Sequence, residues 1–332
     1  MNSNNSITKA VKILCDGGLV AFPTETVYGL GADAMNSNAS ERIFKVKNRP
    51  RNHPLIIHVS CISLAKRIVS DWPKQADEFA EKFWPGPMTL VFKKNDLLPE
   101  CVTAGHNTVA VRIPSHKTAQ NLLKKFEQSG SGYIAAPSAN IYGLLSNTCY
   151  SDVKSAIGKQ LSTCDLILDG NVCSYGLEST IIDFSSENLT ILRPGSITRS
   201  NIQESLGLNI KSTDPNKSIP IVSGSTARHY CPKTPLYVLT HSEAAKKLNK
   251  LLIKNNSNKK YFYWGFKSLT YVSSYLNQEI APNNAIEYAK QLYLKLNEVD
   301  RNEYEGIFFE LPPNNHEWEA INNRLEKASS QS

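Results

Sequence analysis

Apolar residues recur with two different spacings in the first two-thirds of the chain, and these spacings predict both helices and strands. Ile7, Val11 and Leu14 have helical spacing, and their run stops at Gly17 and Gly18, which favours a helix with a glycine cap. Further helices are predicted over residues 40–47, 76–84 and 118–130. Short apolar or alternating runs predict strands over residues 19–22, 54–59, 88–92, 108–114, 133–137, 164–170, 179–184 and 189–195.

The last two predicted strands are separated only by the polar turn SSEN, which indicates a hairpin. We therefore predict a mixed α/β domain over residues 1–205, with hairpins rather than a strict βαβ repeat. Residues 206–235 are polar, contain Pro, Ser and Gly, and predict a linker. Strand-like runs at 236–240, 259–266 and 306–312, with helical runs at 242–254, 284–297 and 317–328, predict a smaller Rossmann-like α/β domain over residues 236–332.

Composition narrows the class of protein. The 332 residues are 41% hydrophobic and 20% charged, as in a globular protein, and the net charge of +7 favours anionic ligands. This excess is mild for a dedicated nucleic-acid binder, so both nucleotide phosphates and a transient tRNA contact are compatible with it. The seven cysteines are scattered without C-x-x-C, which argues against a disulfide framework or a zinc site. Without a signal peptide or an apolar run of ~20 residues, we predict a cytoplasmic protein with no membrane segment.

Positive charge is concentrated directly before the strand predicted at 54–59, on Lys45, Lys47, Arg49, Arg51 and His53. Because a residue before proline avoids helical geometry, Pro50 should end the preceding helix near Asn48. One interpretation is that the lysines only complement the helix dipole, worth ~0.3–1 kcal/mol each. For Lys47, Arg49, Arg51 and His53, set around Pro50 and Pro54, we favour another: a fixed cluster that binds a triphosphate with little reordering.

Two predicted strands end in proline followed by small polar residues, in FPTETVYGLGADA at 22–34 and AAPSAN at 135–140. Open α/β sheets bind ligands beyond the carboxyl ends of their strands, so both segments are candidate ligand loops. For residues 22–34, a simple turn between strand and helix is an equal alternative. No phosphate-binding glycine loop, zinc-protease motif or serine-nucleophile elbow is present, so a nucleotide site must be built from dispersed residues.

Several single residues have a structural interpretation beside a functional one. Arg112 alternates with apolar neighbours and would by default lie on the solvated face of a half-buried strand. Arg193 has the same ambiguity, Ser179 and Thr180 fit a plain turn, and His58 fits a core histidine. No His, Cys, Asp or Glu group has metal-ligand spacing, so we predict no protein metal site, and a divalent ion would arrive with phosphates.

Seven segments in series resemble the YrdC-type threonylcarbamoyl-AMP synthases over roughly residues 5–200: PTETVYGLGADA, KVKNRP with HPLIIHV, WPGPMTLVF, TVAVRIPSH, AAPSAN, GLESTIIDF and ILRPGSIT. The family's K-x-R and S-x-N signature corresponds to Lys47-Asn48-Arg49 and Ser138-Ala139-Asn140. RHYCP in the linker and the α/β tail resemble the longer, two-domain branch. The resemblance implies a twisted, open mixed sheet with a large concave basic cavity, together with the small second domain.

The resemblance also implies roles for individual residues. The signature residues Lys47, Arg49, Ser138 and Asn140 would be catalytic. Threonine would be held by Thr26, His58, Arg112, the backbone around Ala136, and Ser179. ATP would be met by Arg49, His53, Thr108, Ser138, Ser146 and Arg193. His53 stands where the family often has Asn, and Ala227 stands where longer members place a tyrosine over the site, so Arg228, His229 or Tyr230 would take that role.

The implied reaction joins L-threonine, bicarbonate and ATP, with Mg²⁺, into L-threonylcarbamoyladenylate and pyrophosphate, a nucleotidyl transfer. A downstream tRNA threonylcarbamoyl-transferase complex would then modify the adenosine next to the anticodon. Two alternatives are a non-catalytic RNA-binding module that uses the same basic concave surface, and a carbamoyl-transfer domain with another acceptor. The first would bind tRNA with steep salt dependence and without ATP. The second is disfavoured because zinc-finger and acylphosphatase-like segments are missing.

Overall fold

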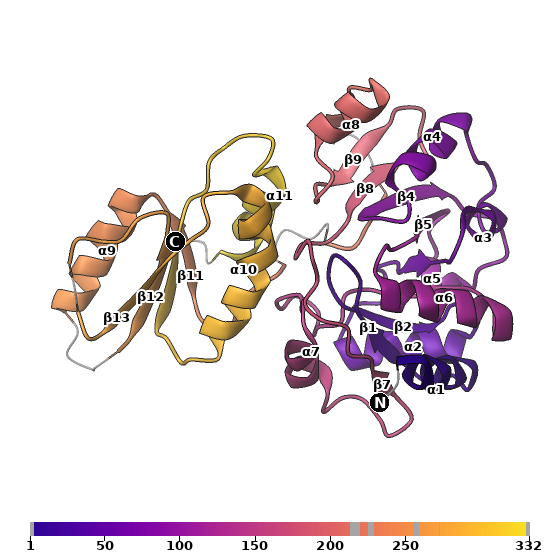
Figure 1. Ribbon diagram of the computed structural model, residues 1–332, viewed down its shortest axis with the longest axis horizontal. Coiled ribbons are helices and arrows are strands. Elements are labelled where there is room, and N and C mark those ends of the chain that lie inside the picture. The colour runs from indigo at the N-terminus through magenta and orange to yellow at the C-terminus, as the bar shows by residue number, and fades with distance from the viewer. Residues whose placement is uncertain (1–2, 213–219, 225–228, 255–258, 272, 330–332) are drawn as a thin grey trace. The chain divides into compact units, whose positions relative to one another are not determined.

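The computed structural model describes residues 3–212, 220–224, 229–254, 259–271 and 273–329 (Figure 1). The chain divides into two compact units. The first comprises residues 1–142 and 146–225, and the second comprises residues 143–145 and 226–332. No helix among the described residues is long and apolar enough to cross a membrane.

The first unit is built on a mixed sheet with the strand order β10-β9-β8-β4-β5-β3-β6-β2-β1-β7. Strand β3 pairs parallel with β5 and antiparallel with β6, so the mixed α/β prediction is confirmed. The predicted hairpin is also present, since β8 and β9 are antiparallel. The strands are β1 Val20–Phe22, β2 Gly29–Asp33, β3 Ile56–His58, β4 Met88–Lys93, β5 Thr108–Arg112, β6 Ile134–Ala135, β7 Leu166–Ile167, β8 Thr180–Asp183, β9 Thr190–Arg193 and β10 Lys211–Ser212.

Residues 22–34 form a loop and a strand, and not only the simple turn that one interpretation of the sequence predicted. After a loop at 23–28, β2 folds back antiparallel on β1, with Val20 opposite Gly31. A side chain at Gly31 would collide with its neighbours, because an added Cβ would lie 2.8 Å from Ile134 and 2.9 Å from Phe22. The glycine therefore allows β2 to pack closely between two strands, and the loop before it is held at the edge of this hairpin.

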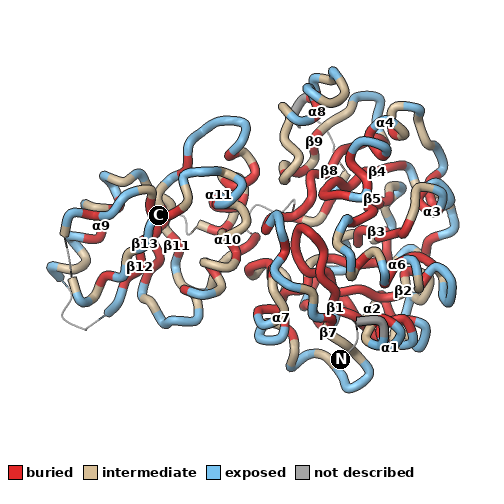
Figure 2. The backbone as a smooth tube through the Cα atoms, in the orientation of Figure 1, coloured by how far each residue is buried: buried red, intermediate tan, exposed pale blue. Residues whose placement is uncertain are grey.

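Helices cover the sheet, and their outer turns are exposed while the strands are buried (Figure 2). Helix α2 begins earlier than predicted, because the Asn36 side chain accepts a hydrogen bond from the Ala39 amide at 3.1 Å. Ser40, the predicted cap, is instead buried within the helix. The helices of this unit are α1 Ser3–Cys15, α2 Ser37–Lys47, α3 Ile62–Arg67, α4 Lys74–Phe83, α5 Glu100–Thr103, α6 Lys117–Ser129, α7 Tyr150–Ile157 and α8 Arg199–Leu206.

The second unit has a parallel sheet with the order β11-β14-β12-β13, so its predicted Rossmann-like character is confirmed. Helix α9 lies on one side of the sheet, and α10 and α11 lie on the other (Figure 1). Strand β13 was not predicted, because polar residues interrupt its apolar pattern. The elements are β11 Leu236–Leu239, α9 His241–Ile253, β12 Tyr261–Gly265, β13 Leu276–Ile280, α10 Ala285–Asp300, β14 Gly306–Glu310 and α11 Glu319–Ala328.

Part of the predicted linker packs on the first unit. Val222 is buried in a cluster with Ile56, Val91, Ala110 and Ile181. Ala227 and Arg228, considered for closing the site, lie outside the described residues. His229 and Tyr230 belong to the second unit, where the Tyr230 ring lies 5.3 Å from the Arg324 guanidinium carbon.

Candidate active site

The two halves of the K-x-R and S-x-N signature meet in the structure. Lys47 is the last residue of α2, and its Nζ donates to the carbonyl oxygens of Ser138, at 2.5 Å, and Asn140. A third contact, to Asn140 Oδ1, measures 3.5 Å. The Lys47 ammonium therefore fixes the loop that presents Ser138 and the Asn140 amide.

Lys47 is 1% exposed, whereas Lys45 on the same turn is exposed. Burial, followed by the charge of Arg49, lowers the pKa of Lys47 well below its ordinary value. The helix-dipole interpretation suits Lys45. It does not explain Lys47, because burying a lysine costs more than a dipole interaction returns unless its donors are satisfied. The three acceptors around Nζ satisfy them.

Arg49 is fixed by several acceptors. Its Nη2 donates to the Pro54 carbonyl at 3.0 Å and to Ser223 Oγ at 3.1 Å, and its guanidinium carbon lies 5.8 Å from the centre of the Tyr142 ring. The Tyr142 hydroxyl also lies 3.2 Å from His53 Nε2. Burial, and then Arg49 and a neighbouring histidine, lower the pKa of His53.

Arg51 does not join this cluster, so the prediction of a single group of fixed cations is wrong at that position. Its side chain is 72% exposed and pairs with Glu41 at 2.7 Å. Arg51 lies in the exposed turn that follows Pro50, whereas Arg49 is buried, so the two guanidiniums do not share one site.

Arg193 lies beside Ser179 and reaches the same segment as Arg49. Its Nε and Nη2 donate to the Ser179 carbonyl and Oγ, both at 3.1 Å, and its Nη1 donates to the Ser223 carbonyl at 2.9 Å. Ser223 therefore accepts from both arginines predicted to meet ATP. Sequence reasoning missed Ser223, because a serine in a polar linker carries no local signal of such a contact.

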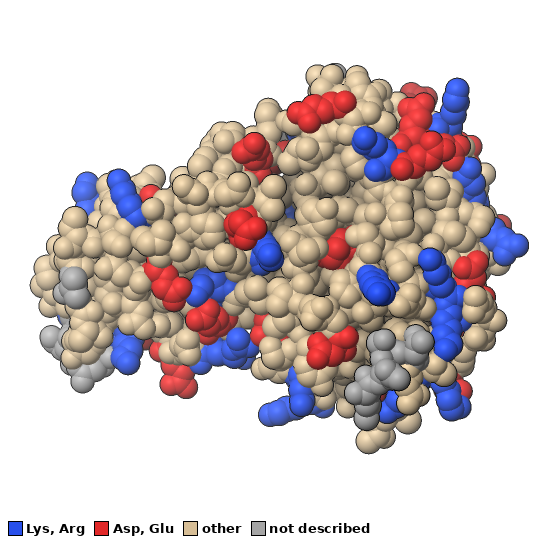
Figure 3. Space-filling model, in the orientation of Figure 1, with Lys and Arg blue, Asp and Glu red and all other residues tan. Residues whose placement is uncertain are grey.

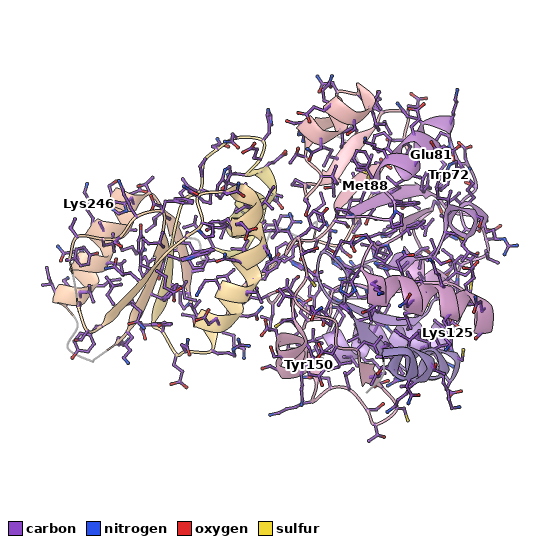
Figure 4. All side chains as sticks on the ribbon, viewed as in Figure 1. Trp72, Glu81, Met88, Lys125, Tyr150 and Lys246 are labelled. Carbon is purple, nitrogen blue, oxygen red and sulfur yellow. The ribbon has the colours of Figure 1, made fainter. Side chains whose placement is uncertain are left out.

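Arg112 is buried, so its interpretation as a solvated-face residue is wrong. It is 4% exposed, donates to Thr26 Oγ1 at 2.8 Å and pairs with Glu25 at 2.6 Å. Its Nε donates to the Gly86 carbonyl at 3.2 Å, two residues before Met88, which starts β4 and is labelled in Figure 4. Sequence reasoning also missed Glu25, although a carboxylate between two threonines after a strand was visible.

The remaining predicted residues lie at the ends of neighbouring strands or in the loops beside them. Thr108 starts β5 and lines a hollow of about 370 Å³ with Lys93, Lys94 and Asn107. The Ala136 amide donates to the Ile56 carbonyl at 2.9 Å and is thus used by the sheet. Ser146 is fully buried and donates to Glu178 at 2.5 Å, so that proton is committed.

His58 is a buried, uncharged imidazole. It is 4% exposed, its Nδ1 lies 3.2 Å from the Ile56 carbonyl, and its ring meets the Phe22 ring edge-on at 5.9 Å. Burial, with a smaller contribution from the charge of Arg112, lowers the pKa of His58 to about 3. The ring is therefore a neutral hydrogen-bonding group near pH 7.

This pKa is expected to make the stability of the first unit fall in acid. An unfolded histidine titrates near pH 6.5 and folded His58 only near pH 3, so the unfolded chain takes up the proton first. The contribution of neutral His58 to the free energy of unfolding is constant above pH 6.5. It falls as the pH is lowered, and about 2 kcal/mol is lost at pH 5. Urea unfolding measures the free energy of unfolding at pH 7 and at pH 5. The drop between the two pH values should be about 2 kcal/mol smaller for His58→Gln than for the native chain.

The matched control is His316→Gln, which changes an exposed histidine and should lose as much stability as the native chain. Equal losses in the native chain and His58→Gln would contradict the prediction.

Among the described residues, no group of three or more His, Cys, Asp or Glu side chains could hold a metal ion. The guanidinium donors of Arg49 and Arg193 suit anionic oxygens. This donor set therefore fits a phosphate chain that brings its own divalent ion. On the face shown in Figure 3, positive and negative side chains are interspersed rather than gathered into one extended basic surface.

Two family models match the chain and together cover most of it. A family described as "Telomere recombination", which groups the Sua5, YciO and YrdC proteins, matches residues 12–195. A second, "Threonylcarbamoyl-AMP synthase, C-terminal domain", matches residues 197–330. The chain is 35% identical to the threonylcarbamoyl-AMP synthase of Pyrococcus abyssi, covering 96% of this chain and 93% of that protein. It is 34% identical to the Bacillus subtilis enzyme, covering 97% and 92%.

The crystal structure of P. abyssi Sua5 complexed with L-threonine is similar over 97% of this chain and 94% of that one, at 35% identity and a TM-score of 0.86.

Proposed function

The chain belongs to the YrdC-type threonylcarbamoyl-AMP synthases in their two-domain form, and on that premise we propose that it joins L-threonine, bicarbonate and ATP into L-threonylcarbamoyladenylate, releasing pyrophosphate. The observation that carries the proposal is the contact of Lys47 with both Ser138 and Asn140, beside the buried Arg49 and Arg193. Arg49 and Arg193 both donate to Ser223, and the charge of Arg49 acts on Lys47, so this arrangement gathers cations and hydrogen-bonding groups in one place. As a reaction class it is a nucleotidyl transfer.

The threonine subsite is proposed to form around Arg112. A guanidinium binds a carboxylate through paired N–H donors, and Arg112 is held in one orientation by Thr26 and Gly86. Neutral His58, the Ser179 hydroxyl and the backbone around Ala136 are then proposed to meet the substrate hydroxyl and amine. The Ser179 hydroxyl would exchange its contacts with Thr89 and Arg193 for the ligand. A relative solved with L-threonine supports this assignment of the substrate.

The ATP subsite is proposed to use Arg49 and Arg193 as the binding cations. Both guanidiniums now donate to Ser223, so phosphate oxygens would replace a neutral serine as their acceptors. A phosphate oxygen carries negative charge and a serine oxygen does not, so the exchange adds attraction between opposite charges. Ser138 and Asn140 complete the subsite, and His53, Thr108 and Ser146 are its further candidates.

The chemistry needs no side-chain nucleophile. Threonine and bicarbonate supply an N-carboxylate, which attacks the α-phosphorus of ATP, and pyrophosphate leaves. Both reactants are anions, so the residues must offset repulsion and align the groups. Arg49 and Arg193 would neutralise the triphosphate, and Lys47 would keep the Ser138–Asn140 loop in place. Mg²⁺ enters as part of the MgATP substrate and supplies charge neutralisation on the leaving pyrophosphate.

The product is proposed to serve tRNA modification in the cytoplasm. A downstream threonylcarbamoyl-transferase complex would transfer the group to an adenosine next to the anticodon, with a transient tRNA contact compatible with the mild basic charge. The rival RNA-binding module would use the same positive charges on an open surface. Burial of Lys47, Arg49 and Arg193 favours a small anionic ligand instead.

One omission assay tests the function. Pyrophosphate release should require L-threonine, bicarbonate, ATP and Mg²⁺ together, and should stop when any one is left out or when EDTA removes the metal. Radiolabelled bicarbonate should enter a product only with the amino acids that are substrates. Release without threonine would contradict the proposal, and salt-sensitive tRNA binding without any ATP turnover would favour the RNA-binding module.

A further inference from the structure

The proposed threonine subsite contains a buried carboxylate to which the family resemblance assigns no role. Glu25 is 3% exposed. One of its carboxylate oxygens accepts from Arg112 Nη2 at 2.6 Å, and the other accepts from the Ser115 amide at 3.0 Å. Its backbone carbonyl accepts from the Tyr175 amide at 2.8 Å. Glu25 is therefore held in one position from both ends.

Glu25 also decides which donors of Arg112 remain for a ligand. A guanidinium has five N–H groups. Among the described residues, Nε donates to Gly86, Nη1 to Thr26 and Nη2 to Glu25. One N–H on each terminal nitrogen is left, which is what a bidentate carboxylate needs.

The pair carries no net charge. Both side chains are buried, with 5% of Arg112 and 4% of Glu25 exposed, so each feels the other's charge with little screening. Two titratable groups close to the pair are neutral, because burial lowers the pKa of His58 to about 3 and raises the pKa of the Cys173 thiol. A zwitterionic amino acid leaves this balance unchanged, whereas a ligand bearing only a carboxylate adds an uncompensated negative charge.

We propose that Glu25 is a positioning and selectivity residue of this subsite, because it orients Arg112 and cancels its charge so that the subsite prefers a zwitterionic amino acid to a simple hydroxy acid. This inference rests on the proposed function and deepens it. The subsite would prefer a ligand with a free ammonium group because the Glu25 carboxylate already balances the charge of Arg112.

The first test uses the native chain and (R)-3-hydroxybutyrate, which is threonine without its ammonium group. Inhibition of threonine-dependent pyrophosphate release gives its affinity, which should be about a hundredfold weaker than that of threonine. Equal affinities would overturn the inference. A native chain that releases no pyrophosphate with threonine would instead overturn the proposed function, so the two failures are distinguishable.

The second test uses Glu25→Gln, which keeps the shape and an acceptor for Arg112 but removes the charge. The KM for threonine should rise at least about thirtyfold while the KM for ATP stays unchanged, and the gap between threonine and (R)-3-hydroxybutyrate should narrow. Glu25→Asp keeps the charge. It should bind threonine more weakly but should keep the difference in affinity between threonine and (R)-3-hydroxybutyrate. The inference is overturned if the affinity difference is unchanged in Glu25→Gln or is lost in Glu25→Asp.

Asp165→Asn is the matched control, since Asp165 is also buried and pairs with Arg42 at 2.6 Å in the same unit. Loss of stability alone would affect both variants, but only Glu25→Gln should change the preference for the ammonium group. If Glu25→Gln does not fold, the native chain and Glu25→Asp decide the question.

Discussion

Lys47→Ala is expected to lower the rate of pyrophosphate release by about 10²–10³-fold. Lys47 Nζ holds the carbonyls of Ser138 and Asn140, so its removal takes a charged donor away from both and loosens the loop that presents the signature residues. A displacement of about 1 Å in such groups is enough for a loss of about 10²-fold. Steady-state rates with saturating threonine, bicarbonate and MgATP measure the effect.

Lys45→Ala is the control for this variant, because Lys45 is on the same helical turn but exposed. It should keep the native rate. Lys47→Met retains the buried aliphatic chain, so a low rate in a folded Met variant assigns the loss to the ammonium group rather than to packing. Native rates in both Lys47 variants would contradict the role given to this lysine.

Arg112→Met is expected to destabilise the first unit by about 3–5 kcal/mol and to abolish threonine-dependent turnover. The stability loss arises because Glu25 keeps its buried charge after its partner is removed. Urea unfolding, followed by a signal from the first unit, measures the free-energy change. Turnover should not recover at high threonine concentration if the carboxylate site is lost.

The double variant Glu25→Gln/Arg112→Met separates these two effects. Removing both charges of a buried pair is often nearly neutral for folding, so stability should recover in large part. Turnover should remain absent, because the arginine is still missing. A double variant as unstable as Arg112→Met alone would show that the pair does not account for the loss.

Local sequence patterns predicted the elements that position the site. The runs at 54–59 and 108–114 are largely apolar because β3 and β5 are buried, and Pro50 marks the end of α2 correctly within a residue. The hairpin of β8 and β9 followed from one polar turn. In each case the signal lies within a few residues of the structure that it predicts.

The misses at the site have a different cause, because each depends on residues far apart in sequence. Ser223 meets Arg49 across 174 positions, and Glu25 meets Arg112 across 87. Arg112 alternates like a surface residue, and only the sheet around it shows that both faces of β5 are covered. Asn36 was overlooked as the cap of α2 because Ser40 is an equally good capping residue a turn later.

Ser223 offers its hydroxyl to one arginine and its carbonyl to another, and a triphosphate bound at both guanidiniums would compete for the same donors. Competition of this kind is reciprocal. By whatever factor residues 220–224 weaken the binding of the nucleotide, the nucleotide weakens the binding of residues 220–224 by the same factor. Binding of the nucleotide and release of the Ser223 contacts would then be one equilibrium, which can be measured either as nucleotide binding or as loss of those contacts.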